Sequence, residues 1–152
     1  MIIENNTKFC ISTALSEAVM GYPTDGLLVE IKYSPAGSGR YISGTYYRMT
    51  PTRRHGKLIR LRINRSNRYP VQVQFKTSDY KRKIDSRGQT IIYQKMRVEK
   101  FNTPEDLLLA IFLHEFSHYL DHIEGRNGRY KQTKADKFAI DILQRLDVIA
   151  KR

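Results

Sequence analysis

TPEDLLLAIFLHEFSHYLDHI (residues 103–123) is the stretch that decides the fold of this chain of 152 residues. Thr103 is suited to cap a helix, Pro104 fits the first helical position, and the acids at 105–106 favour the positive end of the helix dipole. The apolar run 107–113 is long enough to bury a helix but well short of the roughly 20 residues of a membrane span. We therefore predict a buried helix that ends at about Ile123.

The remaining sequence predicts one helix before a group of strands and another helix after residue 130. Asn6 or Thr7 is expected to cap the first helix, whose apolar residues recur at helical spacing from Phe9 to Val19. The same spacing recurs over 131–149. Alternating apolar and polar residues predict five strands, with a basic turn region at 81–88. These strands are expected at residues 27–33, 41–49, 58–64, 71–75 and 90–98. The elements predict a single α+β domain over residues 1–152, with an N-terminal helix, a twisted and mostly antiparallel sheet and a C-terminal helix.

Three of the four histidines lie within nine residues of the predicted helix. His114 and His118 are four residues apart, so their imidazoles project from one helix face and can bind the same metal ion. Zinc suits such nitrogens, because it is a borderline-soft ion that prefers tetrahedral sites. Glu115 is placed to take a proton from a zinc-activated water and to pass it to a leaving amine. The motif predicts a zinc hydrolase.

The third protein ligand of this metal is left open by the sequence. His122 lies about 12 Å along the helix from His114, too far to share the ion, so we expect it to face solvent or to support the ligands. Asp136 is expected either to bind the metal directly, which is the preferred prediction, or to orient a ligand histidine. A donor for the transition-state oxyanion is expected among Tyr46, Tyr47, Tyr119, Arg129 and Tyr130.

The motif HEFSH at 114–118, followed by KADKFA at 134–139, resembles the active-site region of the zincin metallopeptidases. The similarity is greatest to the gluzincin-like ImmA/IrrE and HtpX groups, while residues 44–47 and 58–64 resemble the SprT-like proteases. In the gluzincin-like groups the third ligand is a Glu four positions before the Asp, and Gln132 stands there in this chain. The resemblance implies a compact zincin-like fold in which a sheet packs on the HExxH helix and an edge strand aligns a peptide substrate.

Positive charge is concentrated in the middle of the chain. The net charge is +12, from 27 Lys and Arg and 15 Asp and Glu. Residues 53–100 hold 15 basic and 3 acidic residues, and the remainder holds 12 of each sign, so this segment carries the whole excess. Such a segment indicates either a nucleic-acid partner or a solubilising surface. For a nucleic-acid partner, the predicted phosphate contacts are Arg53, Arg54, Lys57, Arg60, Arg62, Arg65 and Arg68.

Three functions follow as hypotheses. The first is a zinc metalloendopeptidase of the HExxH type that cleaves a protein or peptide substrate and acts on proteins associated with nucleic acid. The second, favoured by the neutral Gln132, is a non-catalytic zincin-fold protein that binds nucleic acid or a protein partner. The third is a basic nucleic-acid-binding module in which the histidine motif is accidental.

The location is expected to be cytoplasmic, with no membrane attachment. The N-terminus lacks the basic start and the apolar stretch of a secretory signal. Cys10 is the single cysteine and cannot form an internal disulfide. It is expected to be a buried, small hydrophobic residue.

Overall fold

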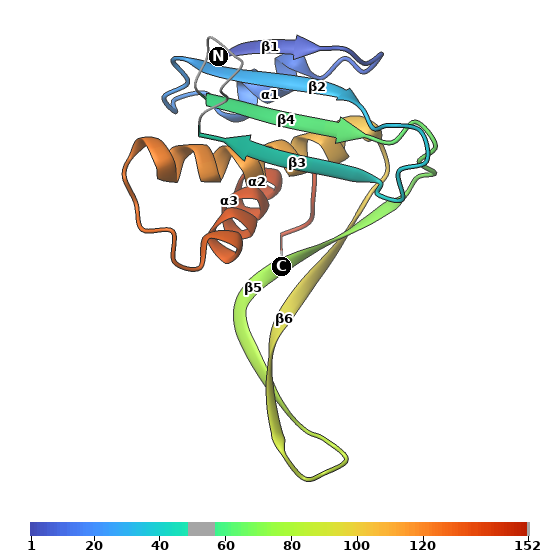
Figure 1. The fold of residues 1–152 in the computed structure, drawn as a ribbon, viewed down its shortest axis with the longest axis vertical. Helices are drawn as coiled ribbons and strands as arrows, with labels where there is room; N and C mark the ends of the chain where they lie inside the picture. Colours follow the sequence, from blue (N-terminus) through green and yellow to red (C-terminus); the bar gives the residue numbers. More distant parts are fainter. Residues whose placement is uncertain (49–56, 152) are drawn as a thin grey trace.

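The computed structural model describes residues 1–48 and 57–151. These residues form three helices and six strands, in a mixed sheet and an antiparallel pair, which confirms the predicted α+β class (Figure 1). The elements are β1 (Ile2–Asn5), α1 (Ser12–Ala18), β2 (Leu27–Tyr33), β3 (Ile42–Tyr47), β4 (Lys57–Ile63), β5 (Val71–Ile84), β6 (Thr90–Phe101), α2 (Pro104–Ile123) and α3 (Lys131–Arg145).

The first four strands form one sheet in the order β1-β2-β4-β3. A mostly antiparallel sheet was expected, but in this sheet only the β3–β4 pairing is antiparallel, and the other antiparallel pairing is that of the separate β5–β6 hairpin. The β1–β2 and β2–β4 pairings are parallel. The parallel pairing of β1 and β2 requires a crossover, and α1 lies in that connection. The strand β3 is left at the sheet edge.

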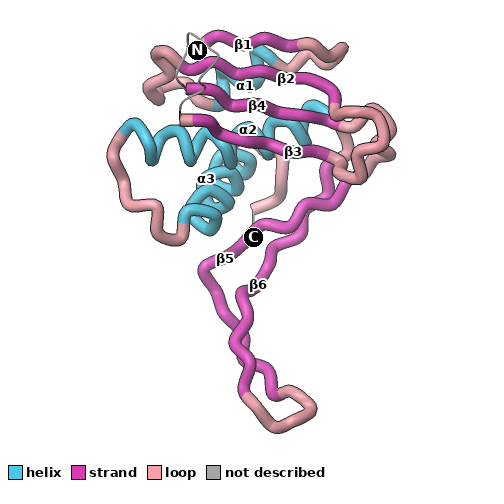
Figure 2. Tube along the Cα trace, viewed as in Figure 1, coloured by secondary structure: helices cyan, strands magenta, loops and turns pink. Residues whose placement is uncertain are grey.

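The hydrophobic core lies between this sheet and the helices on one of its faces (Figure 2). The alternation expected in β4 is confirmed, because Ile59, Leu61 and Ile63 are fully buried in this core. The whole run Leu107–Leu113 of α2 is also buried, except for the half-buried Ile111. Each large apolar side chain buried in this way stabilises the fold by roughly 1.5–3 kcal/mol.

The start of α2 is as the sequence predicts. Thr103 has an extended backbone, and its hydroxyl accepts a hydrogen bond from the Asp106 amide at 3.2 Å. Pro104 is the first helical residue, where its missing N–H costs no hydrogen bond. None of the described helices combines the length and the apolar character needed to cross a membrane.

Helix α3 packs against α2, and the paired strands β5 and β6 form a long hairpin beside α3. The small residues Ala135 and Ala139 are fully buried and allow the two helices to approach closely. Phe75 and Phe101 fill the base of the hairpin with an edge-to-face ring contact at 6.3 Å. The far end of the hairpin projects away from the rest of the molecule (Figure 1).

The N-terminal prediction was wrong in two respects. The chain does not form a helix from residue 6 or 7, because the Asn5 carboxamide oxygen accepts hydrogen bonds from both the amide and the hydroxyl of Thr7 and stabilises a turn. The helix begins only at Ser12. Cys10 is exposed rather than buried, since it lies in the loop before α1 and Ile11 takes the buried position.

Two later boundaries also differ. Residues 81–84, expected in a basic turn, continue β5, and the turn is confined to residues 85–89. Helix α3 ends at Arg145, short of the expected residue 149. The first prediction made β5 too short, because strand pairing extends the hairpin to Ile84. The second made α3 too long by four residues.

Candidate metal centre

The centre of the site is the pair of histidines on α2. Nε2 of His114 and Nε2 of His118 are 3.1 Å apart, with ring centroids separated by 4.8 Å. Two nitrogens that bind one zinc ion at 2.0–2.1 Å in tetrahedral geometry stand roughly 3.3 Å apart. The imidazoles therefore already have the separation that a shared zinc ion requires.

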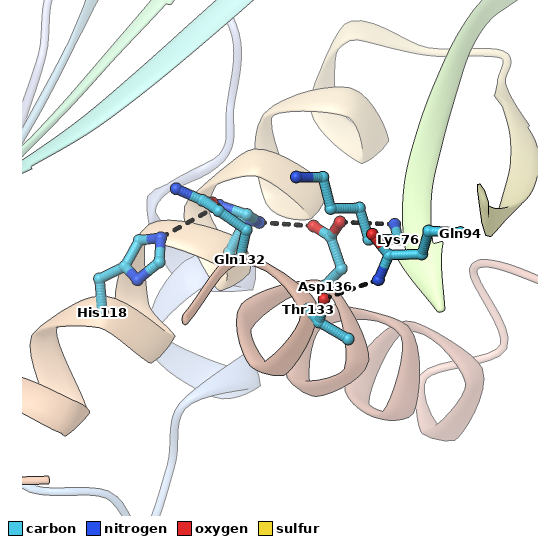
Figure 3. Close-up of polar contacts among 7 residues, drawn as sticks. Lys76, Gln94, His118, Gln132, Thr133 and Asp136 are labelled. Atoms are coloured by element: carbon cyan, nitrogen blue, oxygen red, sulfur yellow. Dashed lines mark hydrogen bonds and ion pairs between the residues drawn. The ribbon is translucent and has the colours of Figure 1, made fainter. Parts of the chain in front are cut away.

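Gln132, in the first turn of α3, approaches the same point. Its Oε1 lies 2.8 Å from Nε2 of His114, so two ring nitrogens and an amide oxygen converge (Figure 3). All three atoms carry lone pairs, and one proton cannot satisfy all of them at once, whereas a cation at their centre can. Among residues 1–48 and 57–151, no three His, Cys, Asp or Glu side chains form a group that could hold a metal ion. A third protein ligand at this point would thus be the amide.

Asp136 lies on the opposite side of the His114 ring. Its Oδ1 is 2.6 Å from Nδ1 of His114, and its Oδ2 accepts a hydrogen bond from the backbone amide of Lys76 at 2.7 Å (Figure 3). This carboxylate holds the Nδ1 proton and leaves Nε2 free to bind a metal. The arrangement is the one expected of an acceptor that orients a ligand histidine. Direct ligation by Asp136 stays a prediction.

The two histidines differ in their proton affinity. Burial lowers the pKa of His114, but the hydrogen bond and negative charge of Asp136 outweigh this effect, so the pKa is raised overall. Burial lowers the pKa of His118, and the neighbouring positive charge of His114 lowers it further. Without a metal, the first proton taken up by the pair therefore goes to His114.

The side chain of Glu115 lies close against strand β3, because Gly44 of that strand has no side chain to exclude it. A Cβ atom on Gly44 would lie 2.8 Å from Cγ of Glu115 and 2.6 Å from Cγ2 of Ile111, so a larger residue cannot fit without displacing these side chains. The carboxylate also receives a backbone hydrogen bond from Tyr46. Burial raises the pKa of Glu115, which makes it a stronger base than an exposed glutamate.

These groups open onto a cleft of about 460 Å³. One wall is the edge strand β3, and among the described strands none pairs with its outer side. The opposite walls come from α2, α3 and the loop between them. The cleft is lined by Gly44, Thr45, Tyr46, Arg48, His114, Glu115, His118, Asp121, Arg126, Gly128, Lys131 and Gln132.

Protein-family models, curated proteins and solved structures were all compared with this chain. None of them matches it. What the site can do is therefore inferred from its own side chains.

The other histidine and the tyrosines take different positions. Nδ1 of His122 is 2.7 Å from the Tyr46 hydroxyl and does not reach the pair on α2, in agreement with the expected spacing. Burial raises the pKa of Tyr46 to about 12, so its hydroxyl stays protonated at neutral pH. Tyr119 is buried and donates to the carbonyl of Pro23, outside the cleft. Of the five predicted oxyanion donors, only Tyr46 lines the cleft.

The predicted nucleic-acid contacts are divided between a strand and a loop. Arg53 and Arg54 lie outside the described residues. On β4, Arg60 is paired with Glu30 at 2.8 Å. In the following loop, the Arg65 guanidinium lies 4.0 Å from the Tyr33 ring centroid. The remaining predicted contacts are Lys57, Arg62 and Arg68, of which only Arg68 is exposed.

The sequence analysis missed Gly44 and Asp121. A single glycine inside an aromatic-rich strand is a signal of close approach, and here it marks the position of the Glu115 carboxylate. Asp121 is a buried residue of the cleft lining, and its Oδ1 accepts from Arg126 at 3.3 Å. Nothing in the local sequence distinguishes Asp121 from a surface acid of the same helix.

Proposed function

We propose that this chain is a zinc-dependent metallopeptidase of the zincin type. His114 and His118 would hold the metal, with Gln132 as the third protein donor, and Glu115 would act as the general base. The observation that carries the proposal is the 3.1 Å separation of the two Nε2 atoms in a cleft that also contains the buried Glu115 carboxylate.

Each side chain has a distinct role in this proposal. A zinc ion supplies Lewis acidity towards water and towards a substrate carbonyl oxygen. Glu115 accepts a proton from the attacking water and returns it to the departing amine nitrogen, a task for which its raised pKa suits it. Asp136 fixes the tautomer and the orientation of the His114 ring.

The free edge of β3 supports a peptide as the substrate. Gly44, Thr45 and Tyr46 line the cleft from this strand, whose outer backbone groups have no partner strand among the described residues. An extended peptide can pair with such an edge and present its carbonyl carbon to the base. The surplus positive charge of residues 53–100 supports substrates that are themselves associated with nucleic acid.

Metal analysis combined with peptide hydrolysis tests the proposal. The purified chain should contain one zinc ion per molecule, and His114→Ala and His118→Ala should contain none. Glu115→Gln should keep the zinc but lose about 10²- to 10⁴-fold in the rate of cleavage of an unstructured protein such as casein. Glu105→Gln, at the start of the same helix, is the matched control. Absence of zinc from the wild-type chain, or full activity in Glu115→Gln, would overturn the assignment.

A second function, a non-catalytic zincin-fold protein that binds a partner, is favoured by one observation. The amide of Gln132 is a weaker metal donor than the carboxylate expected at this place. For this function, zinc should be present in both the wild-type chain and Glu115→Gln, with no hydrolysis in either. Gln132→Glu should then bind zinc more tightly, and any appearance of hydrolysis in that variant would show that the remaining machinery is competent.

A further inference from the structure

The far end of the β5–β6 hairpin is a free-standing ribbon. Between Lys76 and Tyr80 the strand register shifts, and beyond this irregularity Tyr80–Ile84 pairs with Thr90–Gln94. We call residues 80–94 the distal arm. Gln94, at its base, contacts α3, and beyond this residue the arm projects from the body with none of the described helices and no other described strand against it (Figures 1 and 2). A two-stranded hairpin alone is marginally stable in water, so the arm is expected to be stabilised by a partner.

Both faces of the distal arm carry exposed apolar side chains together with basic ones. Cross-strand partners share a face, so Lys81 and Tyr93 lie on one face and Arg82 and Ile92 on the other. The exposed fractions are 72% for Ile84 and 62% for Ile92 on one face, and 44% for Ile91 and 43% for Tyr93 on the other. Docking on a flat protein surface would cover only one of these faces. A partner that contacts both faces must surround the ribbon.

Charge complementarity identifies the kind of partner. Residues 71–101 contain 8 basic and 3 acidic residues, so the hairpin carries a net charge of +5. The arm alone holds Lys81, Arg82, Lys83 and Arg87 against Asp85. A second copy of the hairpin would bring two positive ribbons together, which charge repulsion disfavours. A polyanion with a groove satisfies both the charge and the two-sided apolar surface.

We propose that the distal arm binds in the groove of duplex DNA. The major groove of B-form DNA is about 12 Å wide and admits a two-stranded β-ribbon. In such a groove the lysine and arginine side chains reach the phosphates, and the isoleucine and tyrosine side chains contact base edges and thymine methyl groups. The deep, narrow major groove of A-form RNA does not admit a ribbon of this kind.

The arm is fixed to the body of the protein at its base. Gln94 donates a hydrogen bond to the Thr133 hydroxyl at 2.9 Å, and the backbone amide of Lys76 donates to Asp136 (Figure 3). Gln94 also donates to the Thr77 carbonyl at 2.7 Å. DNA held by the arm would therefore lie at a defined position relative to the cleft. The proposal does not depend on the metallopeptidase assignment, because zinc content and DNA binding are measured separately.

Fluorescence anisotropy of a labelled 20-base-pair DNA duplex, at several salt concentrations, tests the proposal with the full chain. The triple variant Lys81→Ala, Arg82→Ala, Lys83→Ala should weaken binding by about tenfold or more and should reduce the slope of log affinity against log salt by about 2 to 3. The control triple variant Lys8→Ala, Arg40→Ala, Lys151→Ala removes the same charge from exposed positions elsewhere and should change binding much less.

A second variant tests the apolar part of the ribbon. Ile92→Ser with Tyr93→Ser should lose about 10- to 100-fold in affinity with an unchanged salt slope, since only apolar contacts are removed. All variants should keep the wild-type circular dichroism. The proposal is overturned if the wild-type chain does not bind the duplex, if it binds an RNA duplex or single-stranded DNA equally well, if both triple variants weaken equally, or if the arm instead mediates a dimer that sedimentation detects without DNA.

Discussion

The acidic side chains around the cleft beside α2 are buried, whereas the basic side chains of the distal arm are exposed. Glu115 in the cleft and Asp136 behind the His114 ring are buried, and each has a hydrogen-bond partner from a distant part of the chain. In the arm, Lys81 and Ile92 are exposed, and the backbone pairs only with the neighbouring strand. The cleft depends on the packing of the whole fold, whereas the arm depends on local pairing and on what it binds. The two regions should therefore respond differently to almost any perturbation.

The largest expected contrast is in amide hydrogen exchange. Amides of Leu107–Phe116 in α2 lie in the buried core and should exchange only by unfolding of the whole domain. Amides of Lys81–Ile84 should exchange through local opening, at rates roughly 1,000-fold faster or more. Mass spectrometry of peptides after timed exchange measures both regions in one sample. Equal protection would show that the arm is as firmly packed as the helix and that the two regions do not differ in local stability.

The next largest effect is expected from Gly44→Ala. The new Cβ would meet side-chain atoms of Glu115 and Ile111 at 2.8 and 2.6 Å, so the general base would be displaced. Peptide hydrolysis should fall by about 100-fold, as expected for a displacement of about 1 Å, and stability by about 1–3 kcal/mol. Gly128→Ala is the control, because a Cβ at this other residue of the cleft meets nothing within 4 Å. Similar losses in both variants would contradict a specific role for Gly44.

Asp136→Asn should weaken zinc binding by about 10- to 100-fold. Asparagine has one acceptor oxygen, which cannot serve both the Lys76 amide and Nδ1 of His114. An amide N–H that faced Nδ1 would favour the wrong tautomer of the ligand ring. Competition with a fluorescent zinc chelator measures the affinity. Asp141→Asn, on the exposed side of α3, removes the same charge and should have little effect. Loss of zinc altogether in Asp136→Asn would favour direct ligation instead.

The metal-free histidines should titrate at different pH values. Because the pKa of His114 is raised and that of His118 is lowered, His114 should become protonated first as the pH falls. Asp136→Asn should move the His114 midpoint to lower pH, since the main interaction that raises this pKa is removed. NMR of the imidazole protons gives both midpoints. Protonation of His118 before His114 would show that the carboxylate does not control the pair.

The smallest effect is expected from shortening the arm. Replacing residues 81–93 by Asn-Gly keeps the Tyr80–Gln94 pair and closes the hairpin with a two-residue turn. Because all the removed side chains except the half-buried Asp85 are exposed, the free energy of unfolding should change by no more than about 0.5 kcal/mol, and zinc content should be unchanged. Denaturant titration and metal analysis measure these quantities. A large loss of stability would mean that the arm supports the core after all.

The sequence predicted the elements whose signals are local. The cap at Thr103 and the proline at 104 located the start of α2, and the apolar alternation in β4 located that strand and its buried face. The spacing of His114 and His118 predicted their shared direction, because helix geometry depends only on neighbouring residues.

The N-terminal strand and the length of the hairpin could not be predicted from local sequence patterns. Residues Ile2–Asn5 are a strand only because β2 lies beside them, and their four residues carry too little pattern to indicate it. Lys81–Ile84 looks like a turn by composition, but cross-strand pairing with Thr90–Tyr93 extends β5 through it. Pairing partners that are distant in sequence leave no local signal.

The sequence alone determined an α+β chain with two histidines and a glutamate on one helix, because caps, periodicity and i to i+4 spacing are properties of the local chain. Only the tertiary structure decided that Gln132 meets His114 at Nε2 while Asp136 meets it at Nδ1, and that Gly44 gives Glu115 its place. Those contacts join α2 to α3 and β3, and their distances depend on how closely the elements pack, a quantity that no single segment encodes.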